Sequence, residues 1–192
     1  MKNWLSIVAL GAVAAVAGSA IADNRHEQPR RVFRTQLVGF NEVPAVSTTA
    51  RGTFRAVVNQ AGTAFTFWLT YSGLGFNAAQ SHIHFGQHHT NGGISVWLCQ
   101  STTNPAPAAV TANVAVCPLR ETVTPITATI TAADVTGPAG QGIAATEFAE
   151  LLAAMRGGAA YANVHSGTPA VTGPPAVPQV GFPGGEIRGQ IQ

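Results

Sequence analysis

Apolar and polar residues alternate with a period of two over much of the chain from residue 32 onward. The pattern is clearest at residues 64–71, where Phe65, Phe67 and Leu69 alternate with threonines and a tryptophan. Successive side chains of a strand point to opposite faces, whereas a helix repeats about every 3.6 residues, so this segment is predicted to be a strand. Related runs, bounded by turn residues, predict further strands at 32–40, 52–59, 79–85, 93–99, 121–131, 161–165 and 185–191.

One late segment has helical spacing instead. Its apolar positions are Phe148, Leu151, Leu152 and Met155. Thr146 is placed to serve as the N-cap, acidic residues follow in the first turn, and Arg156 and Gly157 are typical of a helix end. We therefore expect a single short helix at about residues 146–156.

Seven to eight short strands with one helix indicate an all-β protein. We expect an antiparallel Greek-key β-sandwich or a partly open barrel. The short, glycine-containing link at residues 60–63 predicts a hairpin between its two flanking strands. A stretch rich in proline and glycine at residues 166–183 is predicted to be a loop. Residues 32–192 are long enough for one domain with a hydrophobic core.

The first 22 residues have the form of a secretory signal peptide. Lys2 gives a positive start, an alanine-rich apolar run follows, and Ala20-Ile21-Ala22 fits a cleavage site. A membrane anchor is the alternative, but the apolar run is short for a bilayer span, and no later segment has that character. We expect residues 23–31 to be a flexible lead-in and the protein to be periplasmic or secreted.

The charge balance gives no sign of a nucleic-acid partner. Without Lys2, nine arginines stand against eight acidic residues, and the arginines are scattered along the chain. Basic clusters that neutralise phosphates are therefore absent from the sequence. We expect no membrane span after cleavage of the signal peptide, while the oligomeric state is left open.

The only two cysteines, Cys99 and Cys117, belong to the exported part of the chain. In an oxidising compartment they are expected to form one disulfide that closes the segment 99–117. A pair of free thiols that ligate copper is the less favoured alternative.

The paired histidines of the strand at residues 79–85 are the main candidates for chemistry. His82 and His84 are two apart, so both side chains project from one face of the strand. His165, on another predicted strand, would complete a three-histidine site of the kind that suits copper, with zinc as the alternative. The competing interpretation is that these histidines only form hydrogen bonds within a polar strand face.

Several other residues are candidates for supporting roles. His88 and His89, in the turn-rich segment after His84, are either additional ligands or solvated loop residues. Glu186 and Arg188 share a strand face, and a structural ion pair or hydrogen-bond bracket, with Glu42 or Asn163 as further partners, is the favoured interpretation. Glu42 is also a candidate to orient a metal-bound histidine.

Five sequence islands together resemble the CHRD domain, a module named after chordin and found in many bacterial exported proteins of unknown role. The islands are Leu37-Val38-Gly39-Phe40-Asn41-Glu42-Val43-Pro44, Ser81-His82-Ile83-His84-Phe85-Gly86, Asn91-Gly92-Gly93-Ile94-Ser95-Val96, Tyr161-Ala162-Asn163-Val164-His165 and Gly184-Gly185-Glu186-Ile187-Arg188-Gly189-Gln190. The resemblance implies an all-β domain and supplies no settled activity. The chain departs from the family pattern in two insertions, one at residues 167–182 and one that carries the cysteines.

The sequence thus supports two functions. The first is an exported metal-binding protein that holds copper or zinc through His82, His84 and His165. The alternative is an adhesion or protein-binding module with structural histidines, in which residues 86–92 and 166–183 recognise the partner. Nucleophilic catalysis finds no support, because the chain lacks a Gly-x-Ser-x-Gly motif and both cysteines are expected in a bridge.

Overall fold

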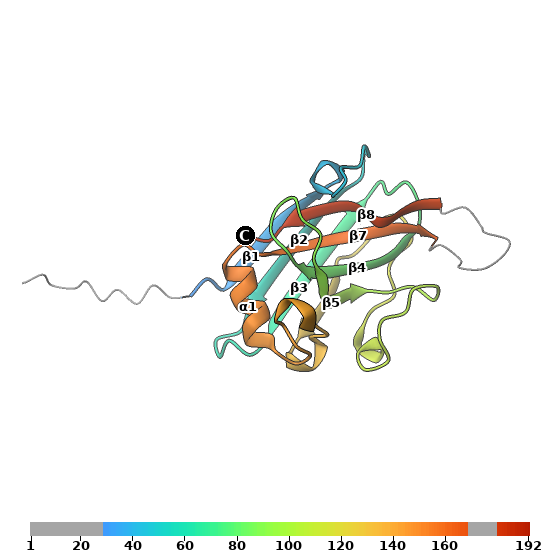
Figure 1. The fold of residues 1–192 in the computed structure, drawn as a ribbon. Helices are drawn as coiled ribbons and strands as arrows, with labels where there is room; N and C mark the ends of the chain where they lie inside the picture. Colours follow the sequence, from blue (N-terminus) through green and yellow to red (C-terminus); the bar gives the residue numbers. More distant parts are fainter. Residues whose placement is uncertain (1–28, 169–179) are drawn as a thin grey trace, which may run out of the picture.

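A computed structural model describes residues 29–168 and 180–192. The predicted signal peptide (1–22), the first part of the lead-in (23–28) and the centre of the Pro/Gly-rich segment (169–179) lie outside the described residues. The described part contains eight antiparallel strands and one α-helix (Figure 1). None of its helices is both long enough and apolar enough to cross a bilayer.

The eight strands form one sheet that curls into a nearly closed barrel. They are β1 Val32–Val38, β2 Arg51–Val58, β3 Phe65–Ser72, β4 Ala78–Phe85, β5 Gly93–Cys99, β6 Ile126–Ile130, β7 Ala160–Thr168 and β8 Val180–Gln190, in the order β5-β4-β7-β8-β1-β2-β3-β6. The two edges approach each other, and just beyond β6 the N–H of Thr136 donates to the carbonyl oxygen of Ser95 in β5. The predicted all-β, antiparallel, partly open barrel is confirmed.

The apolar faces of the strands meet inside the barrel. In the hairpin of β2 and β3, Phe54 lies opposite Leu69, and both are buried. The helix α1 (Phe148–Arg156) covers part of this core, where the ring of Phe148 packs 5.7 Å from that of Phe65. The alternation in the sequence therefore corresponds to one buried and one outward face.

The helix begins two residues later than predicted. Thr146 has φ 73°, in the left-handed region, whereas an N-cap residue typically has a negative φ. Glu147 takes the N-cap position, and its carboxylate accepts the N–H of Ala144 at 2.6 Å. The tight turn before the helix thus excludes Thr146 from the role that its side chain suggested.

Strand lengths also differ from the prediction. The strand expected at 121–131 is confined to Ile126–Ile130, and Val123 before it is 94% exposed. Conversely, parts of the loop expected at 166–183 are strand, because β7 runs to Thr168 and β8 starts at Val180. Gly181 lies opposite Gly167, where a Cβ on Gly181 would stand 2.5 Å from the Gly167 Cα. These glycines allow two backbones to approach closely rather than marking a loop.

The predicted disulfide between Cys99 and Cys117 is present, with an S–S distance of 2.02 Å. The segment that it closes is also held by the side chain of Gln100. Its amide group donates to the carbonyl oxygens of Thr111 and Val114, while its oxygen accepts the N–H of Ala106. The segment is therefore fastened to the end of β5 by both a covalent bond and a hydrogen-bonded amide.

Candidate metal centre

The histidines of β4 lie on the face of the sheet opposite to the apolar core. Ile83 between them belongs to the core, so His82 and His84 project outward. The register places His82 beside Asn163 and His84 beside Tyr161 of β7, and Arg188 and Gln190 of β8 continue the same rows. We call this set the polar layer: His82, His84, Tyr161, Asn163, His165, Arg188 and Gln190.

A loop at residues 86–92, here the covering loop, shields the polar layer from solvent by crossing in front of β7 and β8 (Figure 1). Its backbone is fastened by the layer itself. Gln190 donates to the Gly86 carbonyl oxygen at 2.9 Å, and Arg188 donates to that of Gln87 at 3.1 Å.

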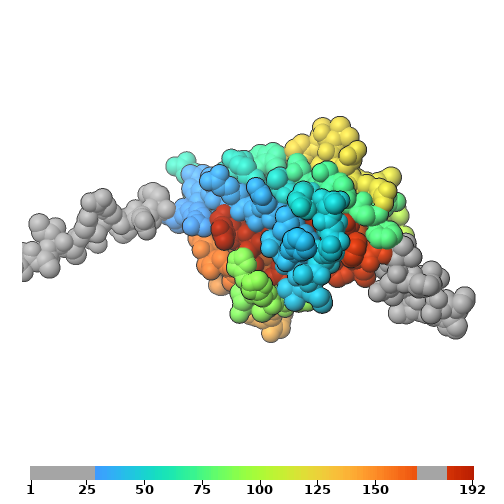
Figure 2. Space-filling model, turned by 90° about the horizontal axis from the view of Figure 1, so that it is seen from above, coloured from blue at the N-terminus to red at the C-terminus, as the bar shows by residue number. Residues whose placement is uncertain are grey.

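The covering loop also contacts the turn that follows β1. The side-chain amide of Asn91 donates to the carbonyl oxygen of Val43 at 3.0 Å. Figure 2 shows the two segments side by side on the surface above β8. The polar layer is therefore buried beneath segments 86–92 and 39–46, although it faces away from the barrel interior.

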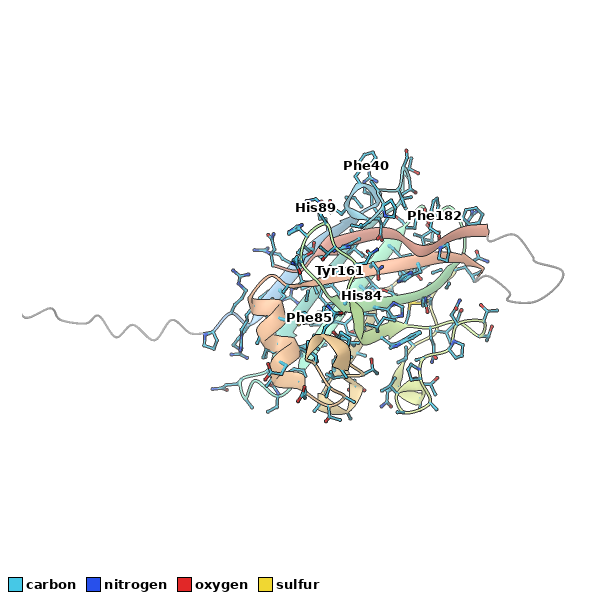
Figure 3. The ribbon with its side chains drawn as sticks, viewed as in Figure 1. Phe40, His84, Phe85, His89, Tyr161 and Phe182 are labelled. Atoms are coloured by element: carbon cyan, nitrogen blue, oxygen red, sulfur yellow. A yellow bond between two sulfur atoms is a disulfide. The ribbon has the colours of Figure 1, made fainter. Side chains whose placement is uncertain are left out.

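The structure brings together the three histidines singled out in the sequence. One ring nitrogen from each of His82, His84 and His165 lies within 4.8 Å of the other two, and all three side chains are buried. The closest approach, between Nδ1 of His82 and Nε2 of His165, is 3.1 Å. His84 is labelled in Figure 3, where it projects from β4 beneath the covering loop.

Two backbone carbonyls determine where the protons of these rings lie. Nδ1 of His84 is 2.9 Å from the carbonyl oxygen of Gly92, and Nδ1 of His165 is 2.8 Å from that of Pro183. A carbonyl oxygen only accepts, so each Nδ1 carries the hydrogen and each Nε2 of these neutral rings carries a lone pair. His82 must then donate from Nδ1 to Nε2 of His165.

Burial keeps all three rings neutral. It lowers the pKa of His84 and of His165 to about 4, although the carbonyls of Gly92 and Pro183 act in the opposite direction. Burial, with the neighbouring imidazoles, lowers the pKa of His82 well below its ordinary value. Neutral imidazoles offer the lone pairs that a metal ion requires.

Aromatic side chains hold the rings from two sides. Trp97 of β5 packs edge-on against His82, with ring centroids 4.3 Å apart, and Tyr161 stacks parallel to His84 at 4.8 Å. The guanidinium carbon of Arg188 lies 3.4 Å from the centre of the Tyr161 ring. Tyr161, Asn163 and His165 alternate along β7 and therefore share one face of the strand, so their spacing in the sequence could have revealed Tyr161 as a neighbour of the histidines. Trp97 becomes a neighbour of His82 only through the register of β5.

Several buried polar atoms of the polar layer have no hydrogen-bond partner among the described residues. They are Nε2 of His82, Nε2 of His84, Oδ1 of Asn163 and Oε1 of Gln190. Buried polar atoms are normally satisfied by protein, water or a ligand. Their concentration around the histidines marks this as a place for a bound group.

The remaining candidates take other positions. His88 and His89 are exposed on the covering loop and are not part of the three-histidine cluster. His89 is labelled in Figure 3. Glu186 accepts hydrogen bonds from Thr48, the Gly75 N–H and Ser166 instead of pairing with Arg188. Glu186 thus ties the β1–β2 link, the β3–β4 link and β7 to β8.

Glu42 is buried but makes no hydrogen bond to a histidine among the described residues. Its Oε1 is without a partner, and its carboxylate lies against the backbone of Gly185. Asn163 keeps its backbone in the β7 ladder beside His82. Of these two residues, only Asn163 adjoins the histidine cluster.

Comparison with known proteins identifies one family. The model of the CHRD domain matches residues 33–170, most of the chain. The match covers β1 to β7, including all three histidines, and ends before β8. No curated protein and no solved structure matches the chain.

Proposed function

The chain belongs to the CHRD domain family, and we propose that it binds a copper ion, with zinc as the alternative metal, through His82, His84 and His165. One observation carries the proposal: the Gly92 and Pro183 carbonyls hold the Nδ1 hydrogens of His84 and His165, so that Nε2 of each is unprotonated. Metal-ligating histidines usually donate their second ring N–H to such a carbonyl or to a carboxylate.

The spacing of the rings fits a small ion after modest movement. Tetrahedral ligands at about 2.0–2.1 Å from zinc stand about 3.3 Å from one another. The ligand nitrogens here lie within 4.8 Å of one another, so displacements on the order of 1 Å would complete the site. Rotation about the side-chain bonds of a histidine is sufficient for such a change.

The donor set favours copper and zinc over other metals. Imidazole suits both ions, and nitrogen sites generally bind Cu(II) more tightly than Zn(II). Hard cations such as Ca²⁺ prefer oxygen ligands, and the cluster includes no carboxylate. Three protein ligands would leave a further coordination position for water or another small ligand.

We propose that this site serves an exported protein that stores or transfers the metal. Residues 1–22 have the features of a signal peptide, and the Cys99–Cys117 disulfide is typical of oxidising compartments outside the cytosol. Both features support export, and neither specifies a catalytic step.

Calorimetric titration of metal-free protein with Cu(II) and Zn(II) tests the proposal. We expect one equivalent to bind, and His84→Ala or His165→Ala to weaken binding at least about 100-fold. The matched control is the double variant His88→Ala/His89→Ala, which removes two exposed imidazoles and should leave the one-equivalent binding unchanged. Equal binding by the wild type and His84→Ala, or loss only in the double variant, would contradict the proposed site.

A protein-binding role is the second candidate, and one observation favours it. The covering loop and the turn after β1 are joined by the Asn91 hydrogen bond, and Phe40 beside them is 73% exposed (Figure 3). If this surface recognises a partner, Phe40→Ser should abolish capture of that partner while metal content stays unchanged.

A further inference from the structure

Glu42 is a buried acid that the proposed metal site does not use. Its side chain is 6% exposed, and Oε1 has no hydrogen-bond partner in residues 29–168 and 180–192. It follows the 3₁₀ turn Gly39–Asn41 at the end of β1. An acceptor left without a donor in a buried position is costly, so its presence calls for an explanation.

The carboxylate of Glu42 lies against the backbone of Gly185, in β8. A Cβ on Gly185 would stand 2.4 Å from Oε1 and 2.7 Å from Oε2, so only glycine permits this contact. Gly185 also has φ 126°, a conformation that other residues rarely adopt. The backbone of Gly185 therefore limits where the carboxyl group of Glu42 can lie.

The same acid lines a cavity of about 270 Å³ between the turn after β1 and the start of β8. The other lining residues belong to the segments 43–46 and 181–185. Glu42 is the only ionisable side chain among them. A ligand in this cavity would meet one carboxyl group and otherwise apolar walls or backbone.

We propose that this cavity, the amine pocket, binds a small alkylammonium ion whose nitrogen donates to Glu42 and whose hydrocarbon part packs against Val46 and Phe182. An ammonium group is a hydrogen-bond donor suited to the carboxyl group of Glu42, which lines the cavity, and a charge-assisted hydrogen bond is stronger than a neutral one. The apolar walls suit a short hydrocarbon chain. An anionic ligand is disfavoured because no basic side chain lines the cavity.

The protonation of Glu42 determines when the ligand binds best. Burial raises its pKa to about 8, while the positive charge of Arg188 acts in the opposite direction. Below that pH, an ammonium ion must displace the carboxyl proton, so binding should strengthen as the pH rises from 6 to 9. A neutral or acidic ligand would not show this increase.

The amine pocket is independent of the proposed metal site. None of its lining residues is a proposed ligand, although the carbonyl of Pro183 accepts from His165. Measurements on metal-free protein therefore test the amine pocket alone, and its failure would leave the metal proposal standing.

Calorimetric or NMR titration with n-butylammonium at pH 9 is the direct test. We expect saturable binding to the wild type and at least about tenfold weaker binding to Glu42→Gln, which preserves the shape of the side chain. Val46→Phe, which adds volume to a wall of the cavity, should also weaken binding, while Glu150→Gln on the exposed face of α1 should not.

Two isosteric probes complete the test. n-Butanol has the same hydrocarbon chain without the charge, and butyrate has the opposite charge; neither should show saturable binding. Absence of butylammonium binding, equal binding by Glu42→Gln, or equal binding of n-butanol would each overturn the proposal.

Discussion

The backbone of Gly185 lies directly against the carboxylate of Glu42, so closely that any side chain at Gly185 would overlap it. The two residues are distant in sequence, one after β1 and the other in β8. Their contact joins two of the sequence islands, Asn-Glu-Val-Pro and Gly-Gly-Glu-Ile-Arg-Gly. One supplies the acid, and the other supplies the glycine that makes room for it.

We expect Gly185→Ala to lower the free energy of unfolding by about 1–3 kcal/mol, the usual cost of overpacking combined with an unfavourable φ. Gly184→Ala is the matched control, because a Cβ at Gly184 would meet nothing within 4 Å. Urea unfolding of both variants gives the comparison. Equal stabilities of the two variants would show that Glu42 moves aside without cost.

Stability should fall as the pH rises through the pKa of Glu42. The pKa of this group is raised from 4.5 to about 8 in the folded protein, so the neutral carboxyl stabilises the fold. That contribution is fully present below about pH 4.5 and is lost as the pH rises through about 8. We expect the free energy of unfolding to drop by on the order of 2 kcal/mol between pH 6 and 9.

Glu42→Gln isolates this effect from other titrations. Arg188 and Tyr161, the ionisable groups that interact with Glu42, do not titrate in this range, because Arg188 is charged and burial raises the pKa of Tyr161 further above 10. The variant should therefore lose most of the decline between pH 6 and 9. A decline as steep as that of the wild type would assign the pH dependence to other groups.

Copper binding should quench the fluorescence of Trp97. The indole ring centroid lies 4.3 Å from that of His82, and Cu(II) quenches a fluorophore at such a distance efficiently. Trp97→Phe should remove the copper-dependent part of the signal. Undiminished quenching in Trp97→Phe would place the copper elsewhere.

Removal of the disulfide should destabilise the protein without removing the histidine cluster. The bridge closes an 18-residue separation, for which the chain-entropy model gives about 3 kcal/mol. We expect Cys99→Ala/Cys117→Ala to unfold at correspondingly lower urea concentrations and still to bind one metal equivalent. Chemical reduction of the wild type is the control and should reproduce the loss of stability.

Much of the fold was predictable because one face of each strand is buried. Alternation located β3 and β4 to within one residue at each end, and the two outward histidines followed from their spacing. The meeting of His165 with them was a hypothesis based on residue type, since strand order cannot be derived from periodicity. The sheet register, which places β7 beside β4, brings His165 next to the two histidines of β4.

What the sequence did not reveal depends on tertiary contacts. Gly167 and Gly181 indicated a loop, whereas in the fold they permit two strands to pack closely. Thr146 had a suitable side chain for an N-cap but the wrong backbone conformation. The carbonyls of Gly92 and Pro183 carry no side-chain signal at all, yet they set the tautomers of two histidines.

Because the polar layer lies on the outside of the barrel, access to it does not require opening of the hydrophobic core. The covering loop must detach, and its fastenings include the hydrogen bonds from Gln190, Arg188 and His84 and the bond from Asn91 to the carbonyl oxygen of Val43. An ion held there could enter and leave at rates set by seven residues of loop, while the barrel remains folded. Exchange kinetics and global stability would then be tuned by different parts of the chain.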